Sequence, residues 1–244
     1  ENPRLRIYLE GPPMSSGGGA GPPIRIPPPP PEIVRQHFRL REPGRLSGWQ
    51  EIDGWLGKEA QVAFEHGDRD YFARAIPLGF GADPEILYYA SNAGRDTFGL
   101  YALDLRTKRR TDFALEDPRF DLVEFPATAP ESALVFDRQH RLAGVRVGGV
   151  PSRTRWLDPN LVRIQRRLDE KFPARDVEIV DWDAAVRRVV ALVTGPADPG
   201  RYFIFDEGNP GRLSEILRRA PRLTAELLNP AAPFEFKTPA GVTL

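Results

Sequence analysis

One short pattern recurs three times in this chain and constrains its fold more than any other feature. An alternating apolar strand ends in an acid at Asp104, Asp158 and Asp206, in the strings "LYALD", "TRWLD" and "YFIFD". An arginine-bearing turn precedes each strand, and an earlier strand precedes each turn. The three acids lie 54 and 48 residues apart. A period of about 50 residues is typical of β-propeller blades, in which four antiparallel strands form a unit and neighbouring units bury each other's faces.

The rest of the chain after residue 46 also favours short strands separated by turn residues. We therefore predict an all-β fold, a partial β-propeller of about three to four blades of antiparallel strands with one or two short helices. A β-sandwich is disfavoured because its turns are not expected to recur with the additional period of about 50 residues. The expected strands are 60–64, 71–76, 86–90, 99–103, 133–136, 142–147, 154–157, 177–182, 188–194 and 202–205.

Two helices and a terminal hairpin interrupt this pattern. Asp158 can cap a helix that starts at Pro159 and runs to Phe172, with Leu161, Ile164 and Leu168 on one stripe. A second short helix is expected at 221–228, and residues 234–244 favour a hairpin around a "TPAG" turn.

Three regions follow from this organisation. Residues 1–45 are predicted to be a Pro/Gly-rich linker or irregular segment, because glycine and proline dominate residues 11–31 and build neither ladder nor helix. The five prolines at 27–31 favour a polyproline II rod, either a docking motif or an inert spacer, and we favour the spacer. Residues 46–220 would hold the blades, and 221–244 the linking helix and the first hairpin of a further domain.

Composition excludes several classes of function. With 34 basic and 34 acidic residues the net charge is zero, so we expect no nucleic-acid partner. No apolar run approaches the roughly 20 residues of a membrane span. The absence of cysteine removes disulfides and thiol chemistry but leaves the compartment open, cytoplasmic or periplasmic.

The residues carry no recognisable catalytic motif. None of the seven serines lies in a G-x-S-x-G elbow, and "SGGGAGPP" lacks the lysine and following helix of a phosphate-binding loop. The histidines, His37, His66 and His140, are far apart in the sequence, and we interpret each as a surface residue. We therefore expect no catalytic, cofactor-binding or metal-binding residue, and no cofactor. Substrate-binding residues are left unassigned.

Charged residues beside the strands have two interpretations each. The acid pairs at 68 and 70, 116 and 117, and 181 and 183 are interpreted as turn residues rather than acid/base or calcium sites. The turn arginines Arg95, Arg153 and Arg201 would either meet a carboxylate on a blade rim or bond to acids beside them, Asp96 and Asp198. We favour the second interpretation. "RTKRR" at 106–110 is interpreted as a solvated turn.

Several longer strings carry a family likeness. The strings "LYYASNAGRDTFGLYALDL", "TRWLDPNLVRIQRRLDEKFP", "VEIVDWDAAVRRVVALVTGPADPGRYFIFD" and "PAAPFEFKTPAGVTL" resemble the propeller region of the prolyl oligopeptidase family of serine peptidases, in its acylaminoacyl-peptidase and dipeptidyl-peptidase-like branch. The likeness covers roughly residues 83–244. Two turns, "FDRQHRL" and "DWDAAVRR", depart from the Asp-Gly turns common in that family.

The resemblance implies that this chain performs its function together with a separate catalytic domain. In that family the propeller restricts access to an α/β-hydrolase domain with a Ser-Asp-His triad, and none of those residues maps onto this chain. We therefore expect a non-catalytic propeller portion that gates short peptides, is partnered by a hydrolase domain of the same polypeptide, and is inactive alone. The alternative is a stand-alone scaffold of the TolB or WD-repeat type that binds other proteins.

Overall fold

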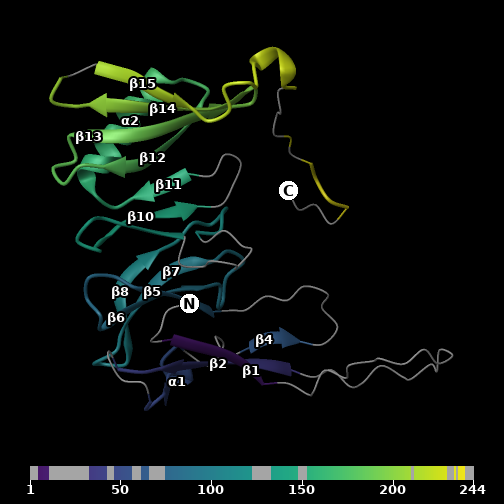
Figure 1. The fold of residues 1–244 in the computed structure, drawn as a ribbon. Coiled ribbons are helices and arrows are strands. Elements are labelled where there is room, and N and C mark those ends of the chain that lie inside the picture. The colour runs from purple at the N-terminus through teal and green to yellow at the C-terminus, as the bar shows by residue number, and fades with distance from the viewer. Residues whose placement is uncertain are drawn as a thin grey trace. The chain divides into compact units, whose positions relative to one another are not determined.

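The computed structural model describes residues 5–10, 33–42, 47–56, 62–65, 75–122, 133–147, 153–209, 212–229, 234 and 236–239. The chain divides into two compact units, Glu1–Arg141 and Leu142–Leu244. Figure 1 labels most of the strands and both α-helices along the chain.

Two four-stranded antiparallel sheets lie in the first unit. The first has the order β1–β2–β3, with β4 also paired to β2, and a short helix, α1 (Asp53–Leu56), follows β3. Its strands are β1 (Leu5–Glu10), β2 (Ile33–Leu40), β3 (Gln50–Glu51) and β4 (Val62–Glu65). The second sheet is a meander, β5–β6–β7–β8, with strands at Ala75–Phe80, Ile86–Ser91, Gly99–Asp104 and Arg109–Leu115.

These two sheets share one apolar core. Phe38 and Leu40 of β2 lie in the same buried cluster as Leu87 of β6 and Leu103 of β7. Full burial of a side chain of this size contributes about 1.5–3 kcal/mol to stability. The first five residues of β7, Gly99 to Leu103, are all buried, which requires cover on both faces of this strand. Sheet-on-sheet burial is the packing expected of repeated β units.

Two further sheets follow along the chain. One has the order β11–β10–β9, with strands at Arg153–Trp156, Leu142–Val147 and Leu134–Phe136. The other is a second four-stranded meander, β12–β13–β14–β15, with strands at Asp176–Trp182, Arg188–Gly195, Asp198–Asp206 and Arg212–Arg218. A short 3₁₀ helix, η3, spans Ala225–Leu227.

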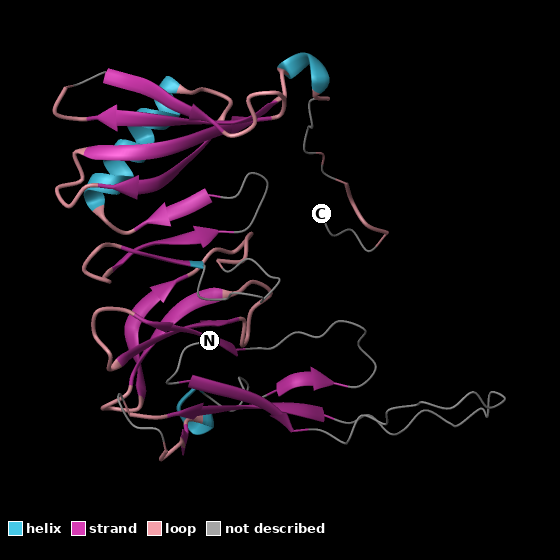
Figure 2. Cartoon of the chain, viewed as in Figure 1, coloured by secondary structure: helices cyan, strands magenta, loops and turns pink. Residues whose placement is uncertain are grey.

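Helix α2 (Pro159–Lys171) follows β11, the third strand of its sheet. In the two meanders, a fourth strand follows the third strand at the corresponding point of the chain. The Asp158 carboxylate caps it, and Pro159 occupies the first turn, where its missing N–H costs no hydrogen bond. At its end, the ring of Phe172 lies 5.0 Å from that of Phe203 on β14. Figure 2 shows α2 running along one face of the β12–β15 sheet. The fully buried residues of its apolar stripe are Leu161, Ile164 and Leu168.

The predicted fold class is confirmed. The structure is mostly β, built from antiparallel sheets of the size of propeller blades, with few helices. Most predicted strands from residue 86 to 206 are present, and so is the helix from Pro159. None of the helices in the described residues is long and apolar enough to cross a membrane.

Several expectations need correction. Part of the segment 1–45, expected to be irregular, forms β1 and β2, because two runs with alternating apolar residues flank the Pro/Gly stretch. The expected helix at 221–228 is reduced to the three residues of η3. Strands β8 and β15 were not predicted, and β8 begins inside the supposed solvated turn at Arg109. Residues 11–32 lie outside the described residues, as does most of the expected hairpin at 234–244.

Some turns place residues other than glycine in the left-handed region. His140 and Val186, in the turns after β9 and β12, have φ of 60° and 51°. Ala174, just after α2, has φ of 59°. This conformation costs a residue with a Cβ about 1–2 kcal/mol.

Replacing Ala174 by glycine should therefore stabilise the chain. We expect Ala174→Gly to raise the free energy of unfolding by about 0.5–1 kcal/mol, because relief of strain exceeds the added freedom of the unfolded chain. Ala185→Gly is the matched control, since Ala185 is also exposed in a turn but has no positive φ. It should lower stability by about 0.4–1 kcal/mol. Chemical denaturation measures both, and equal destabilisation by the two changes would refute the assignment of strain.

Candidate functional site

The three repeated aspartates occupy equivalent positions, each at or just after the end of the third strand of its sheet. Asp104 ends β7, Asp158 follows β11, and Asp206 ends β14. One carboxylate oxygen of each accepts a hydrogen bond from the backbone N–H two residues further on, at 2.8, 2.7 and 3.0 Å respectively. The recurring acid therefore fixes the chain's exit from the third strand.

The surroundings of two of these carboxylates, Asp104 and Asp206, favour the ionised form. The backbone N–H of Arg106 holds the pKa of Asp104 below its usual value. The Arg188 guanidinium, whose Nε lies 2.9 Å from the Asp206 carboxylate, does the same for the pKa of Asp206. A carboxyl group with a lowered pKa is a poor proton donor at neutral pH. These acids are suited to turn formation rather than to general acid catalysis.

The hairpin acids that precede the middle strands behave in the same way. Asp137 accepts from the backbone N–H of Arg141 at 2.8 Å and from its Nε at 2.7 Å. Asp183 accepts from the N–H groups of Arg187 and Arg188 at 2.7 and 3.2 Å. Partial burial raises the pKa of both carboxyl groups, but these hydrogen bonds outweigh it and leave each pKa lowered. The interpretation of Asp183 as a turn residue agrees with this geometry.

Arg201 bonds to the neighbouring acid Asp198, as favoured from the sequence, and both residues lie in the first part of β14. Its Nε and Nη2 donate to the Asp198 carboxylate at 3.1 and 2.9 Å, and its Nη1 lies 3.5 Å from Glu215 on β15. Arg153 is exposed at the start of β11. No hydrogen bond or ion pair joins the Arg153 side chain to another side chain among the residues that the structure describes.

Arg95 takes a different partner from the one expected. Its side chain bonds to Glu116, just after β8, and Nη2 donates to the backbone carbonyl of Asp117 at 3.2 Å. The expectation that it would bond to Asp96 is wrong. Pairing of β7 with β8 brings the end of β8 beside the turn that holds Arg95, although 21 residues separate the two side chains.

Glu116 is the centre of a polar cluster in the first unit. The Tyr101 hydroxyl donates to it at 2.7 Å, and the Arg110 guanidinium lies 3.7 Å from the centre of the Tyr101 ring. The Tyr101 hydrogen bond, followed by that of Arg95, lowers the pKa of Glu116. Burial, and then the Glu116 carboxylate, raise the pKa of Tyr101. Glu116 is thus a fixed anion rather than a proton-transfer group.

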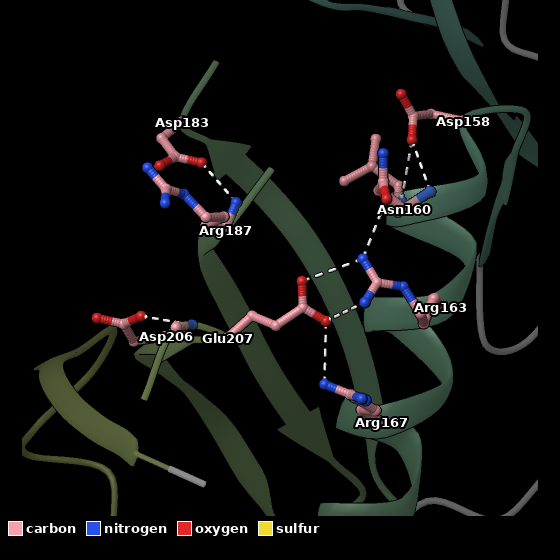
Figure 3. Close-up of polar contacts among 10 residues, drawn as sticks. Asp158, Asn160, Arg163, Arg167, Asp183, Arg187, Asp206 and Glu207 are labelled. Atoms are coloured by element: carbon pink, nitrogen blue, oxygen red, sulfur yellow. Dashed lines mark hydrogen bonds and ion pairs between the residues drawn. The ribbon is translucent and has the colours of Figure 1, made fainter. Parts of the chain in front are cut away.

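A second cluster joins α2 to the β12–β15 sheet (Figure 3). Glu207, in the turn after β14, accepts from both terminal nitrogens of Arg163, one of them at 3.0 Å, and from Arg167 at 2.9 Å. Arg163 also donates to Asn160 at 3.0 Å. The Glu207 side chain is only 15% exposed, so the charge pairing is partly shielded from water. Sequence reasoning missed this cluster, although the four-residue spacing of the arginines places both on one helix face.

His37 is a structural residue rather than a surface one. Its Nδ1 lies 2.6 Å from the Asp53 carboxylate, whose other oxygen accepts from the backbone N–H of Phe38 at 2.6 Å. The pair holds the start of α1 against β2. His140 is exposed, as expected, and stacks on Phe136 with ring centres 4.4 Å apart. His66 lies outside the described residues.

Together these contacts describe folding elements rather than a reaction centre. In the described ranges, no group of three or more histidine or carboxylate side chains is arranged to hold a metal ion. The carboxylates above are bonded to backbone N–H groups, guanidinium groups or a tyrosine hydroxyl. What this arrangement can do is hold turns, strand ends and one helix in place.

Comparisons with known proteins point to peptidases. The chain is 25% identical over 173 residues to dipeptidyl aminopeptidase BIII from Pseudoxanthomonas mexicana, and the match covers 69% of this chain and 23% of that protein. A solved puromycin-hydrolyzing peptidase of Mycobacterium tuberculosis is similar at a TM-score of 0.45 and 18% identity, over 86% of this chain and 28% of that one. That structural likeness is too weak to carry an argument. No protein-family model matches the chain.

The sequence match supports a distant relationship to a peptidase, at low identity. The chain spans less than a quarter of the length of the dipeptidyl aminopeptidase. The resemblance seen in the sequence is therefore supported at this coarser level.

The Glu207 cluster should contribute measurably to stability. We expect Glu207→Gln to lower the free energy of unfolding by about 1 kcal/mol, since it weakens two guanidinium contacts in a partly shielded site. A double-mutant cycle with Arg163→Met should return a coupling energy of similar size. Glu170→Gln, at an exposed position of α2, is the control and should change stability by less than about 0.5 kcal/mol. An additive cycle would contradict the proposed link between α2 and the sheet.

The Glu116 cluster predicts a pH dependence. Because the folded-state pKa of Glu116 is lowered, its contribution to stability is present above the unfolded pKa of about 4.3 and is lost as pH falls through the lower folded value. Glu116→Gln should therefore lower the melting temperature at neutral pH, and the gap to the unmodified chain should close in acid. Asp112→Asn, on the same strand, is the control. A gap that stays constant from neutral to acid pH would show that Glu116 has no such role.

Proposed function

We propose that this chain is the non-catalytic β-propeller portion of a prolyl oligopeptidase-like serine peptidase, and that it gates the access of short peptides to a Ser-Asp-His hydrolase domain of the same polypeptide. The observation that carries the proposal is the sequence match to a dipeptidyl aminopeptidase over 69% of the chain. The match covers only 23% of that enzyme, which leaves most of its length for other parts.

The architecture is compatible with this role. Repeated antiparallel sheets that bury each other's faces, as the first two sheets do, can form a rigid wall. A rigid wall over an active site excludes folded proteins by size and admits flexible peptides. Such a role needs no catalytic group on the wall itself.

The polar residues support the same division of labour. Asp104 and Asp206, at strand ends, have lowered pKa values and bonded partners, so they are unsuited to donating protons. The His37 imidazole is bonded to Asp53 within the first unit, where it stabilises α1. In the proposed enzyme, the nucleophile and its base belong to the hydrolase domain.

The isolated chain should therefore hydrolyse nothing. We expect no release of p-nitroaniline from dipeptidyl or aminoacyl p-nitroanilides at any pH between about 5 and 9, the range in which a histidine-assisted serine would work. A commercial serine exopeptidase serves as positive control. Turnover by the chain that a serine-directed inhibitor abolishes would overturn the assignment.

The coding sequence beyond Leu244 separates this proposal from a stand-alone protein-binding scaffold. A downstream G-x-S-x-G motif followed by aspartate and histidine is the expected result. A stop codon directly after Leu244 would leave the scaffold as the better interpretation.

A further inference from the structure

Exposed apolar side chains concentrate near the end of the second unit. Ile216 and Leu217 of β15 are 51% and 60% exposed, and Leu223 and Leu227 in the turns that follow are 47% and 68% exposed. Only five other large apolar residues in the described ranges are exposed to 40% or more, and two of these also lie in this terminal stretch. They are Phe120, Val162, Val180, Phe234 and Phe236. Exposed apolar residues gathered in one segment are typical of an interaction surface.

The edge position of β15 explains why its side chains are available. Among the strands that the structure describes, β15 pairs with β14 alone, and the order of the sheet ends there. The register shifts so that Tyr202 faces Leu217 and Phe203 faces Glu215, which leaves Ile216 as an extra residue. This bulge exposes two consecutive apolar side chains, where a regular strand would turn one of them inward. An open strand edge with apolar side chains is a template for docking.

The same segment carries an excess of positive charge. Residues 212–227 contain four arginines and two glutamates. Glu215 is already bonded to Arg218 at 2.8 Å. No carboxylate among the described residues pairs with Arg212, Arg219 or Arg222. Carboxylates at the border of a partner that covers the apolar residues would favour its binding to this arginine-rich segment.

We propose that β15 and the turns after it, residues 212–227, are the surface on which the catalytic domain of the same polypeptide docks. The catalytic domain would contribute an apolar patch bordered by acidic residues. This inference rests on the function proposed above. A protein of the matched kind has about three quarters of its length outside this chain, which supplies the occupant. A tethered domain has an effective concentration in the millimolar range for a short linker, so a modest apolar contact is sufficient.

Hydrogen–deuterium exchange tests the surface without relying on activity. The comparison is between the 244-residue chain and the longer polypeptide encoded by its own gene. We expect the amides of residues 212–218 and 223–227 to exchange more slowly in the longer polypeptide, by a factor of about ten or more, because the docked domain shields them. Leu217→Glu in the longer polypeptide should restore fast exchange.

Two further variants separate docking from general destabilisation. Val162→Glu adds the same charge at an exposed apolar position of α2, 44% exposed and outside the surface, and should leave the protection intact. The double charge reversal Arg219→Glu and Arg222→Glu should weaken protection at low ionic strength without altering the apolar residues. Circular dichroism confirms that each variant folds.

The outcomes distinguish this inference from the function on which it rests. Equal exchange in the two proteins overturns the docking surface, and the proposed function stands if the longer polypeptide still cleaves dipeptidyl substrates. Protection without cleavage supports docking but rejects the peptidase. If Leu217→Glu abolishes self-association of the 244-residue chain while the longer polypeptide shows no protection, the surface is an interface between copies and the inference is wrong.

Discussion

The central strands of this chain are apolar on both faces, and the rest of the structure depends on covering them. A strand buried at consecutive positions, as β7 is from Gly99 to Leu103, cannot be stable in a sheet that has one face in water. In the first unit the cover comes from a neighbouring sheet, where Phe38 and Leu40 meet Leu87 and Leu103. In the second unit α2 supplies part of it through three fully buried residues. Repetition of blade-like units follows from this need.

Charged residues complete what apolar burial begins. The aspartates at the ends of third strands bond to backbone N–H groups and fix the exit of the chain, either into a turn or, at Asp158, into a helix. Glu207 and its two arginines then join that helix to the next sheet. The strands and the helix already hold the backbones of these residues in place, so these contacts have to order only the side chains. The polar residues named above thus hold turns, strand ends and one helix in place.

Function is harder to assign because the polar clusters do not specify a reaction. What links the chain to a peptidase is sequence similarity over 173 residues. We propose that the chain is part of a larger enzyme whose chemistry lies elsewhere. The exposed apolar residues of β15 and the turns after it mark where such a part would contact the rest.

The sequence by itself determined the all-β class, the repeat of strand and acid, the strands from 86 to 206 and the helix that starts at Pro159. Alternation with a period of two, and an apolar stripe with a period near 3.6, report directly which side chains are buried. It did not reveal β8 or β15, since strands with few buried residues carry little of that alternation. Only the tertiary structure decided the partners of Arg95 and His37 and the meeting of Glu207 with α2. Strand pairing and helix packing bring these side chains together across 21, 16 and 44 residues of sequence, and no local pattern encodes such contacts.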